Sequence, residues 1–244
     1  MTSTNETGHS VNVANFEKLI AKCIGFGADY KPSNLRITIE ALTQYQATIG
    51  TAVKNVTTLK NALDKAIDER KVLYDPVRDL SLRIVDALRS AEAPDGTIKM
   101  ADSVNAKIQG RRKSEIIEID PTKSESEQSK SISASQTGFD QTMNNFFKLI
   151  DIVKNEPLYK PNEEELTVTA LETLYTSVIN KNTAMIKAAQ DWHQAIIDRD
   201  KAMYTGKNLI TAIAKLVKKY VKSAFKTSSP EYKAVVAIKF TKGR

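Results

Sequence analysis

The feature that most constrains this chain of 244 residues is an internal repetition, in which identical short runs recur in the same order about 130 positions apart. The clearest matches pair Lys18-Leu19-Ile20 with Lys148-Leu149-Ile150, Tyr30-Lys31-Pro32 with Tyr159-Lys160-Pro161, and Gly110-Arg111 with Gly243-Arg244. The offset stays between 129 and 133 along the chain, as small insertions in turns would produce. Because self-similarity at a fixed period marks a repeated structural unit, we predict two copies of one unit, over residues 1–112 and 131–244, with a polar linker over 113–130.

Each copy has the apolar spacing of amphipathic helices. The spacing predicts a first helix over about 12–25, then a long helix of about 40 residues after Tyr-Lys-Pro. A third helix is predicted over 77–91 in the first copy and over 207–225 in the second. No Pro interrupts the long stretches, and their apolar residues recur near every 3.5 positions, which is typical of coiled-coil-like packing.

Capping residues predict where the long helices begin. Ser33 or Asn34 would start the first, and Asn162 would cap the second. The run 163–165 of three glutamates would then occupy a first turn, where carboxylates suit the positive end of the helix dipole. The last segment of the second copy, EYKAVVAIKF, fits a helix or a strand. We therefore predict an all-α fold of two tandem antiparallel helical bundles with an elongated shape.

The composition argues against an enzyme or a metal protein. One Cys and two His are too few for a Cys-rich or His-rich metal site. Cys23 aligns with Val153 on an apolar face and is predicted to be core, His9 falls in a polar N-terminal tail, and His193 adjoins Trp192. No phosphate-binding glycine loop and no nucleophile elbow occur. We predict no catalytic residues, no metal, no cofactor and no small-molecule substrate.

The start of the chain, MTSTNETGHS, is polar and does not have the pattern of a signal peptide. No run of about 18 apolar residues occurs, so no membrane-spanning helix is predicted. We expect a cytoplasmic protein, with non-classical export or packaging into a particle as open alternatives.

The basic charge is concentrated at one end of the chain. The formal net charge is +7, but residues 201–244 contain ten Lys and one Arg against the single acid Glu231. That segment therefore carries +10 and the remaining 200 residues carry −3. The related helix of the first copy, VRDLSLRIVDALRS, includes Asp79 and Asp86 and lacks this excess. The candidate residues for binding an acidic partner, mostly off the apolar stripe of the predicted helix, are Lys207, Lys215, Lys218, Lys219, Lys222 and Lys226.

Three interpretations of these lysines stand side by side. They form a solvated face with no partner, they bind nucleic-acid phosphates or an acidic protein surface, or they lie on an anionic membrane surface. Because Arg reads bases and grips phosphates better than Lys, a nucleic-acid contact would be non-specific. We expect a non-enzymatic structural or interaction protein with a protein partner or self-association. Nucleic-acid binding and membrane-surface activity are the alternatives.

The second copy also carries a recognisable pattern. Tyr159-Lys160-Pro161 opens the long helix, and S-S-P-E-Y-K-x-x-x-x-x-K-F runs from Ser228 to Phe240. This pattern resembles uncharacterised duplicated helical proteins of Bacteroidetes-type bacteria. In the first copy, Ala93-Pro94-Asp95-Gly96-Thr97 replaces Ser229-Pro230-Glu231-Tyr232, so the resemblance is weaker there. It implies a helical fold and supplies no activity and no site residues.

Overall fold

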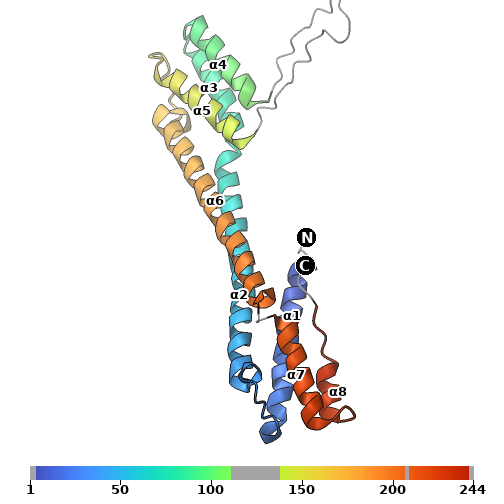
Figure 1. The fold of residues 1–244 in the computed structure, drawn as a ribbon. Helices are drawn as coiled ribbons and strands as arrows, with labels where there is room; N and C mark the ends of the chain where they lie inside the picture. Colours follow the sequence, from blue (N-terminus) through green and yellow to red (C-terminus); the bar gives the residue numbers. More distant parts are fainter. Residues whose placement is uncertain (1–3, 111–137, 207–208, 242–244) are drawn as a thin grey trace, which may run out of the picture. The chain divides into compact units, whose positions relative to one another are not determined.

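The chain folds into helices arranged in two compact units (Figure 1). The computed structural model describes residues 4–110, 138–206 and 209–241, and every regular element in these ranges is helical. Unit 1 consists of Met1–Lys65 and Ile186–Arg244, and unit 2 of Ala66–Met185. The predicted all-α fold is confirmed. Within the described ranges, no helix combines the length and the apolar character needed to cross a membrane.

Unit 1 is built around α1 (Thr4–Gly25), α7 (Ile210–Phe225) and α8 (Pro230–Val236), which pack on one another. It also contains the first part of α2 (Ile39–Tyr74) and the last part of α6 (Val168–Tyr204). Its core side chains come from all of these elements. The buried apolar residues are Phe16, Leu19, Ile20, Cys23, Tyr30, Ile37, Leu42, Ile49, Met203, Ile210, Ile213, Ala214, Val217, Val221 and Val235.

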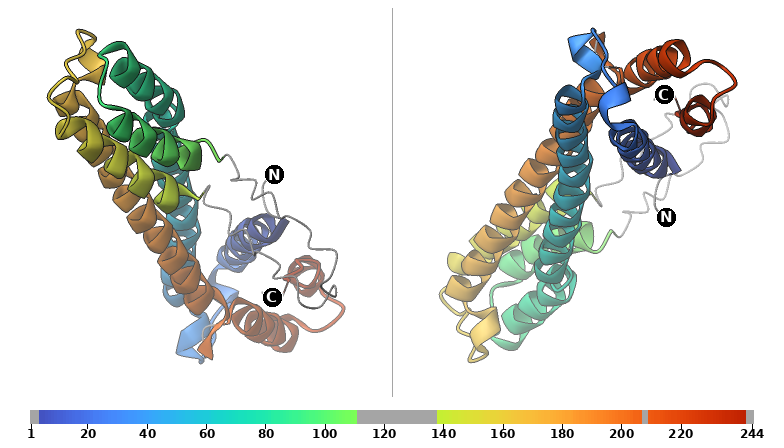
Figure 2. Two further views of the ribbon diagram at one scale, coloured as in Figure 1. Left: turned by 90° about the horizontal axis from the view of Figure 1, so that it is seen from above. Right: turned by 90° about the horizontal axis from the view of Figure 1, so that it is seen from below.

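Unit 2 has the same kind of construction from other segments. Helices α3 (Val77–Ser90), α4 (Asp95–Ile108) and α5 (Phe139–Lys154) pack on one another, and α4 and α5 lie side by side (Figure 2). The rest of α2 and α6 completes the unit. The buried apolar residues are Val77, Leu80, Ile84, Val85, Leu88, Ala93, Ala101, Ile108, Met143, Phe146, Leu149, Ile150, Val153, Tyr159, Leu166, Leu171 and Val178.

The two long helices are confirmed, with 36 residues in α2 and 37 in α6. The buried side chains of α2 recur every seven residues, at Leu42, Ile49, Val56 and Leu63, which is the spacing of coiled-coil packing. Within unit 1 the two helices run antiparallel. Tyr45 near the start of α2 donates its hydroxyl to the carbonyl oxygen of Ala202, near the end of α6, at 3.1 Å.

The predicted starts of the long helices are wrong. A short 3-10 helix precedes each one, at Leu35–Ile37 and at Glu164–Leu166, and the α-helices begin only after Thr38 and Thr167. Each Thr hydroxyl accepts the backbone N–H three residues on, at 3.3 Å in both cases. These threonines therefore provide the caps that the sequence assigned to residues 33, 34 and 162. The glutamates at 164 and 165 belong to the 3-10 turn and not to the long helix.

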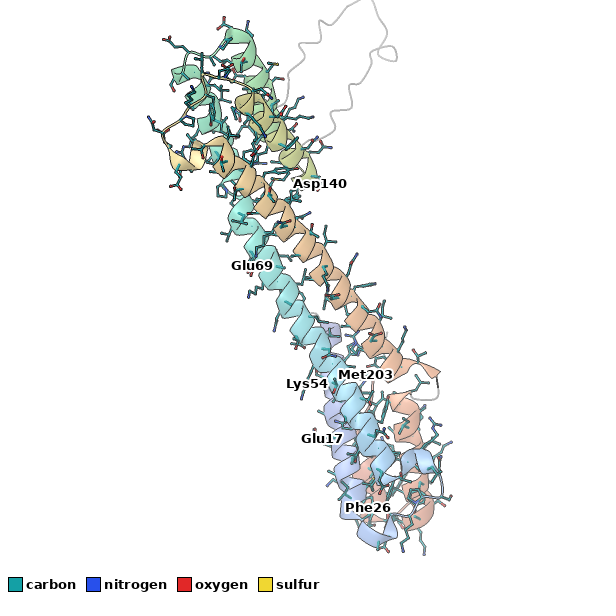
Figure 3. All side chains as sticks on the ribbon, turned by 90° about the vertical axis from the view of Figure 1, so that its left-hand side faces the viewer. Glu17, Phe26, Lys54, Glu69, Asp140 and Met203 are labelled. Carbon is teal, nitrogen blue, oxygen red and sulfur yellow. The ribbon has the colours of Figure 1, made fainter. Side chains whose placement is uncertain are left out.

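Three other boundaries also differ from the prediction. Helix α1 begins at Thr4, so His9 lies inside a helix and is buried rather than in a polar tail. Helix α7 begins at Ile210 and not at 207. The final segment is a helix, α8, because Ser229 accepts the N–H of Tyr232 at 3.1 Å and caps it. The end of α1 agrees with its glycines: Phe26 follows the helix (Figure 3), and Gly27 has a positive φ of 56°.

Each compact unit combines segments of both predicted copies, whereas the sequence predicts one bundle per copy. In unit 1, α1 of the first copy contacts α7 and α8 of the second. In unit 2, α5 of the second copy contacts α3 and α4 of the first. The physical reason is the length of α2 and α6, each of which supplies residues to both units. The predicted linker, 113–130, lies outside the described residues.

Several contacts recur in the two units at positions about 130 residues apart. Tyr30 donates its hydroxyl to the carbonyl oxygen of Ile37 at 2.7 Å, and Tyr159 donates to that of Leu166 at 2.8 Å. Burial raises the pKa of Tyr159 to about 12, so this donor stays protonated at neutral pH. Other recurring features are the ring contacts His9–Tyr204 and Tyr74–Phe139, at 5.4 and 5.1 Å, and the positive φ of Glu92 and Lys226, at 53° and 72°.

Candidate polyanion interface on helix α7

The apolar side of α7 faces the core of unit 1. Its buried residues are Ile210, Ile213, Ala214, Val217 and Val221. They recur at spacings of three and four, which places them on one side of the helix. The apolar stripe that the sequence predicts is therefore used for packing.

The opposite side of α7 carries exposed lysines. Lys215, Lys219, Lys222 and Lys226 are exposed and follow one another at spacings of four, three and four residues. We call these four residues the lysine stripe; along a helix it extends about 16 Å. Helix α7 contains no Asp or Glu, and among the described residues no carboxylate pairs with the stripe. Like charges four residues apart cost a helix about 0.2–0.5 kcal/mol per pair, so the stripe does not stabilise α7.

The corresponding helix of unit 2, α3, neutralises its own charges. The positions 133 residues before Lys219 and Lys222 are Asp86 and Arg89. The Arg89 guanidinium binds the Asp86 carboxylate at 2.8 Å and that of Asp102 on α4 at 2.6 Å. The same packing thus accommodates a paired surface, and the fold does not require unpaired lysines on α7.

The charge difference extends to the whole units. Unit 1 contains 20 Lys and Arg against 9 Asp and Glu, a net charge of +11, whereas unit 2 contains 16 against 20, a net charge of −4. The basic character of the chain therefore belongs to unit 1, and the lysine stripe lies within it.

Lys218 does not belong to this interface, contrary to the prediction. Its ammonium group donates to the carbonyl oxygen of Ile238 and lies 5.5 Å from the centre of the Phe240 ring. Burial, with a smaller contribution from Lys239, lowers the pKa of Lys218. The position 133 residues earlier is the buried Val85, so the stem of Lys218 occupies a partly buried site and its charge caps the segment after α8. Lys207 lies outside the described residues.

Lys218→Ala is expected to destabilise the protein by about 1–2 kcal/mol, because it removes a charged donor to carbonyl oxygens and a contact with an aromatic ring. Lys219→Ala, its exposed neighbour, is expected to change stability by less than about 0.5 kcal/mol. Urea unfolding of the two variants measures the difference. Equal effects would contradict the separate roles of the two lysines.

Arg36 and Lys201 form a second basic feature of unit 1, which the sequence analysis missed. Together with Gln44, Thr48 and Thr205 they line a hollow of about 350 Å³. The matching positions of unit 2 hold Glu165, which pairs with Arg83, and Lys71, which pairs with Asp75. Residue-by-residue comparison of the two copies would have found this difference, because Glu165 stands where Arg36 stands in the first copy.

The remaining chemically capable residues have structural surroundings. Cys23 is buried as predicted, and burial raises the pKa of its thiol to about 11, which keeps it protonated at neutral pH. The Nδ1 atom of His9 lies 2.7 Å from the Tyr204 hydroxyl, and His193 is exposed. In the described ranges, no three or more His, Cys, Asp and Glu side chains gather where they could hold a metal ion.

Family models, curated proteins and solved structures were all compared with the chain, and none of them matches it.

Proposed function

We propose that the protein is a non-enzymatic interaction protein that binds nucleic-acid phosphates through the lysine stripe of unit 1. The observation that carries the proposal is the unpaired state of four exposed lysines on one helix face, with no carboxylate among their described neighbours. An unneutralised row of this kind costs helix stability and is retained where a partner supplies the negative charge.

The surroundings of the stripe favour a phosphate backbone over a membrane surface. An interfacial helix binds a membrane with its apolar side, but the apolar side of α7 lies in the core of unit 1. The stripe contains Lys and no Arg, and a Lys ammonium is a point charge without the bidentate geometry that reads bases. We therefore expect binding that is strong at low salt and independent of sequence.

We also propose that the chain is a duplication whose copies exchange their halves, so that each unit takes its first helix from one copy and its third and fourth helices from the other. The recurring tyrosine hydrogen bonds, threonine caps and ring contacts support this. On this view unit 2 is an internal control for unit 1. The two share a construction and differ in charge, which makes the unpaired lysines of α7 informative.

The salt dependence of binding tests the function. With four phosphates neutralised by the stripe, log K for random duplex DNA should fall with log of salt concentration with a slope of about −3.6, and the slope for single-stranded RNA should be about −2.8. Fluorescence anisotropy at several salt concentrations measures both. Equal affinity for unrelated sequences is expected. Absence of binding to DNA and RNA at low salt would contradict the proposal.

A further inference from the structure

Unit 2 exposes an apolar groove between α4 and α5. The groove has a volume of about 420 Å³ and is lined by Met100, Ser103, Val104, Phe147, Lys148, Asp151 and Ile152. Phe147 is 51% exposed and Met100 is 56% exposed, although both are large apolar residues. Contiguous exposed apolar side chains with polar groups beside them are typical of interaction surfaces.

The fold does not require apolar residues at this place. The positions in unit 1 that match Phe147, Ile152 and Met100 are Glu17, Lys22 and Lys233, at offsets of 130, 130 and 133. All three are charged, and Glu17 lies on α1, the counterpart of α5 (Figure 3). Helices of the same arrangement thus tolerate a charged surface here, so the groove of unit 2 has a role other than packing within the unit.

The exposed residues of α5 are arranged symmetrically about one point of the helix. Phe147 and Ile152 are equally distant from the peptide bond between Leu149 and Ile150, and so are Lys148 and Asp151. Leu149 and Ile150 themselves are buried. A two-fold axis through that point, perpendicular to α5, would place Phe147 of one molecule opposite Ile152 of a second, and the ammonium group of Lys148 opposite the carboxylate of Asp151.

Both charges are available for such a contact. Among the described residues, Lys148 has no ion pair, and the Asp151 carboxylate accepts only a long bond of 3.5 Å from the Asn155 amide. A two-fold interface uses the same patch on both molecules, so the patch has to be complementary to itself. An apolar centre with one lysine and one aspartate at mirrored positions meets that requirement.

We propose that the α4–α5 groove binds the same groove of a second copy of this chain, with α5 packed antiparallel on its counterpart. Phe147 and Met100 fill the apolar centre, and two Lys148–Asp151 pairs close its sides. This interface is independent of the lysine stripe, which lies in the other unit. An interface of one helix pair is small, so the dimer is concentration-dependent.

Sedimentation velocity of the full chain over about a hundredfold range of concentration measures the association. The wild type is expected to shift from monomer to dimer. Lys148→Asp is expected to weaken the dimer at least about tenfold, because two carboxylates then face each other at both ends. The double variant Lys148→Asp with Asp151→Lys restores opposite charges and is expected to restore the dimer. A wild type that stays monomeric, or a double variant no tighter than the single one, would overturn the proposal.

Phe147→Glu places at the groove the residue type of its counterpart in unit 1 and is expected to abolish the dimer. Leu158→Glu is the matched control, because Leu158 is also an exposed apolar residue of unit 2, at 50%, but does not line the groove. Circular dichroism melting verifies that both variants fold. Equal loss of dimer in the two variants would place the interface elsewhere and overturn the proposal. Nucleic-acid affinity should be unchanged in both, so failure of the dimer and failure of the proposed function are distinguishable.

Discussion

Replacing Lys219 by Asp is expected to weaken nucleic-acid binding by about a hundredfold at about 0.1 M salt, because each phosphate contact contributes about tenfold there. The substitution removes one cation of the stripe. It also gives Lys222 a carboxylate partner three residues away, as Asp86 is for Arg89 in α3. Two of the four phosphate contacts should therefore be lost, and the slope of log K against log of salt concentration should fall from about −3.6 to about −1.8. Anisotropy titrations measure both quantities.

Lys99→Asp is the matched control for this variant. It changes the net charge by the same amount, at an exposed position of α4 in unit 2. The fold should tolerate both substitutions, since α3 carries Asp86 at the position equivalent to Lys219. If Lys99→Asp weakened binding as much as Lys219→Asp, the overall charge rather than the stripe would govern affinity.

Cutting the chain between residues 113 and 130 is expected to leave the two fragments associated at the mass of the intact protein. Each unit takes helices from both sides of the cut: α1 packs on α7 and α8, and α5 packs on α3 and α4. Separating the fragments would expose both cores, including Phe16 and Phe146, which have no exposed surface, at a cost of about 25 cal/mol per Å² of apolar area.

A protease site inserted into 113–130 allows the measurement. After cleavage, light scattering should give the intact mass, while a denaturing gel shows two fragments of about half the mass. Release of two independent fragments under native conditions would mean that each copy folds by itself, as the tandem arrangement predicts from sequence.

The sequence predicts the elements of this fold better than their partners. Helical spacing identified the buried faces of α1 and α5, and the absence of Pro identified the two long helices. Apolar periodicity says which side of a helix is buried but not against which helix, so the combination of α1 with α7 did not follow from it. The caps were missed because Asn34 and Asn162 are good capping residues locally. A tertiary hydrogen bond, such as Tyr30 to Ile37, holds the intervening turn as a 3-10 helix.

The candidate site was predictable to a similar extent. The charge asymmetry between the copies pointed to α7, and four of the six lysines form one exposed face. Lys218 could not be separated from Lys219 by sequence, because its surroundings come from Ile238 and Phe240 beyond the following turn. His9 was misplaced because its neighbours in sequence are polar, whereas its partner Tyr204 is 195 residues away.

Lysine reactivity with and without nucleic acid tests the central claim most directly. The chain is treated with an amine-acylating reagent at low salt, with and without random duplex DNA, and the modified positions are identified by mass spectrometry. Protection by DNA is expected at Lys215, Lys219, Lys222 and Lys226, while Lys99 and Lys107 of unit 2 keep their reactivity. Protection of the lysines of unit 2, with the four stripe lysines still reactive, would contradict the assignment of the interface to α7.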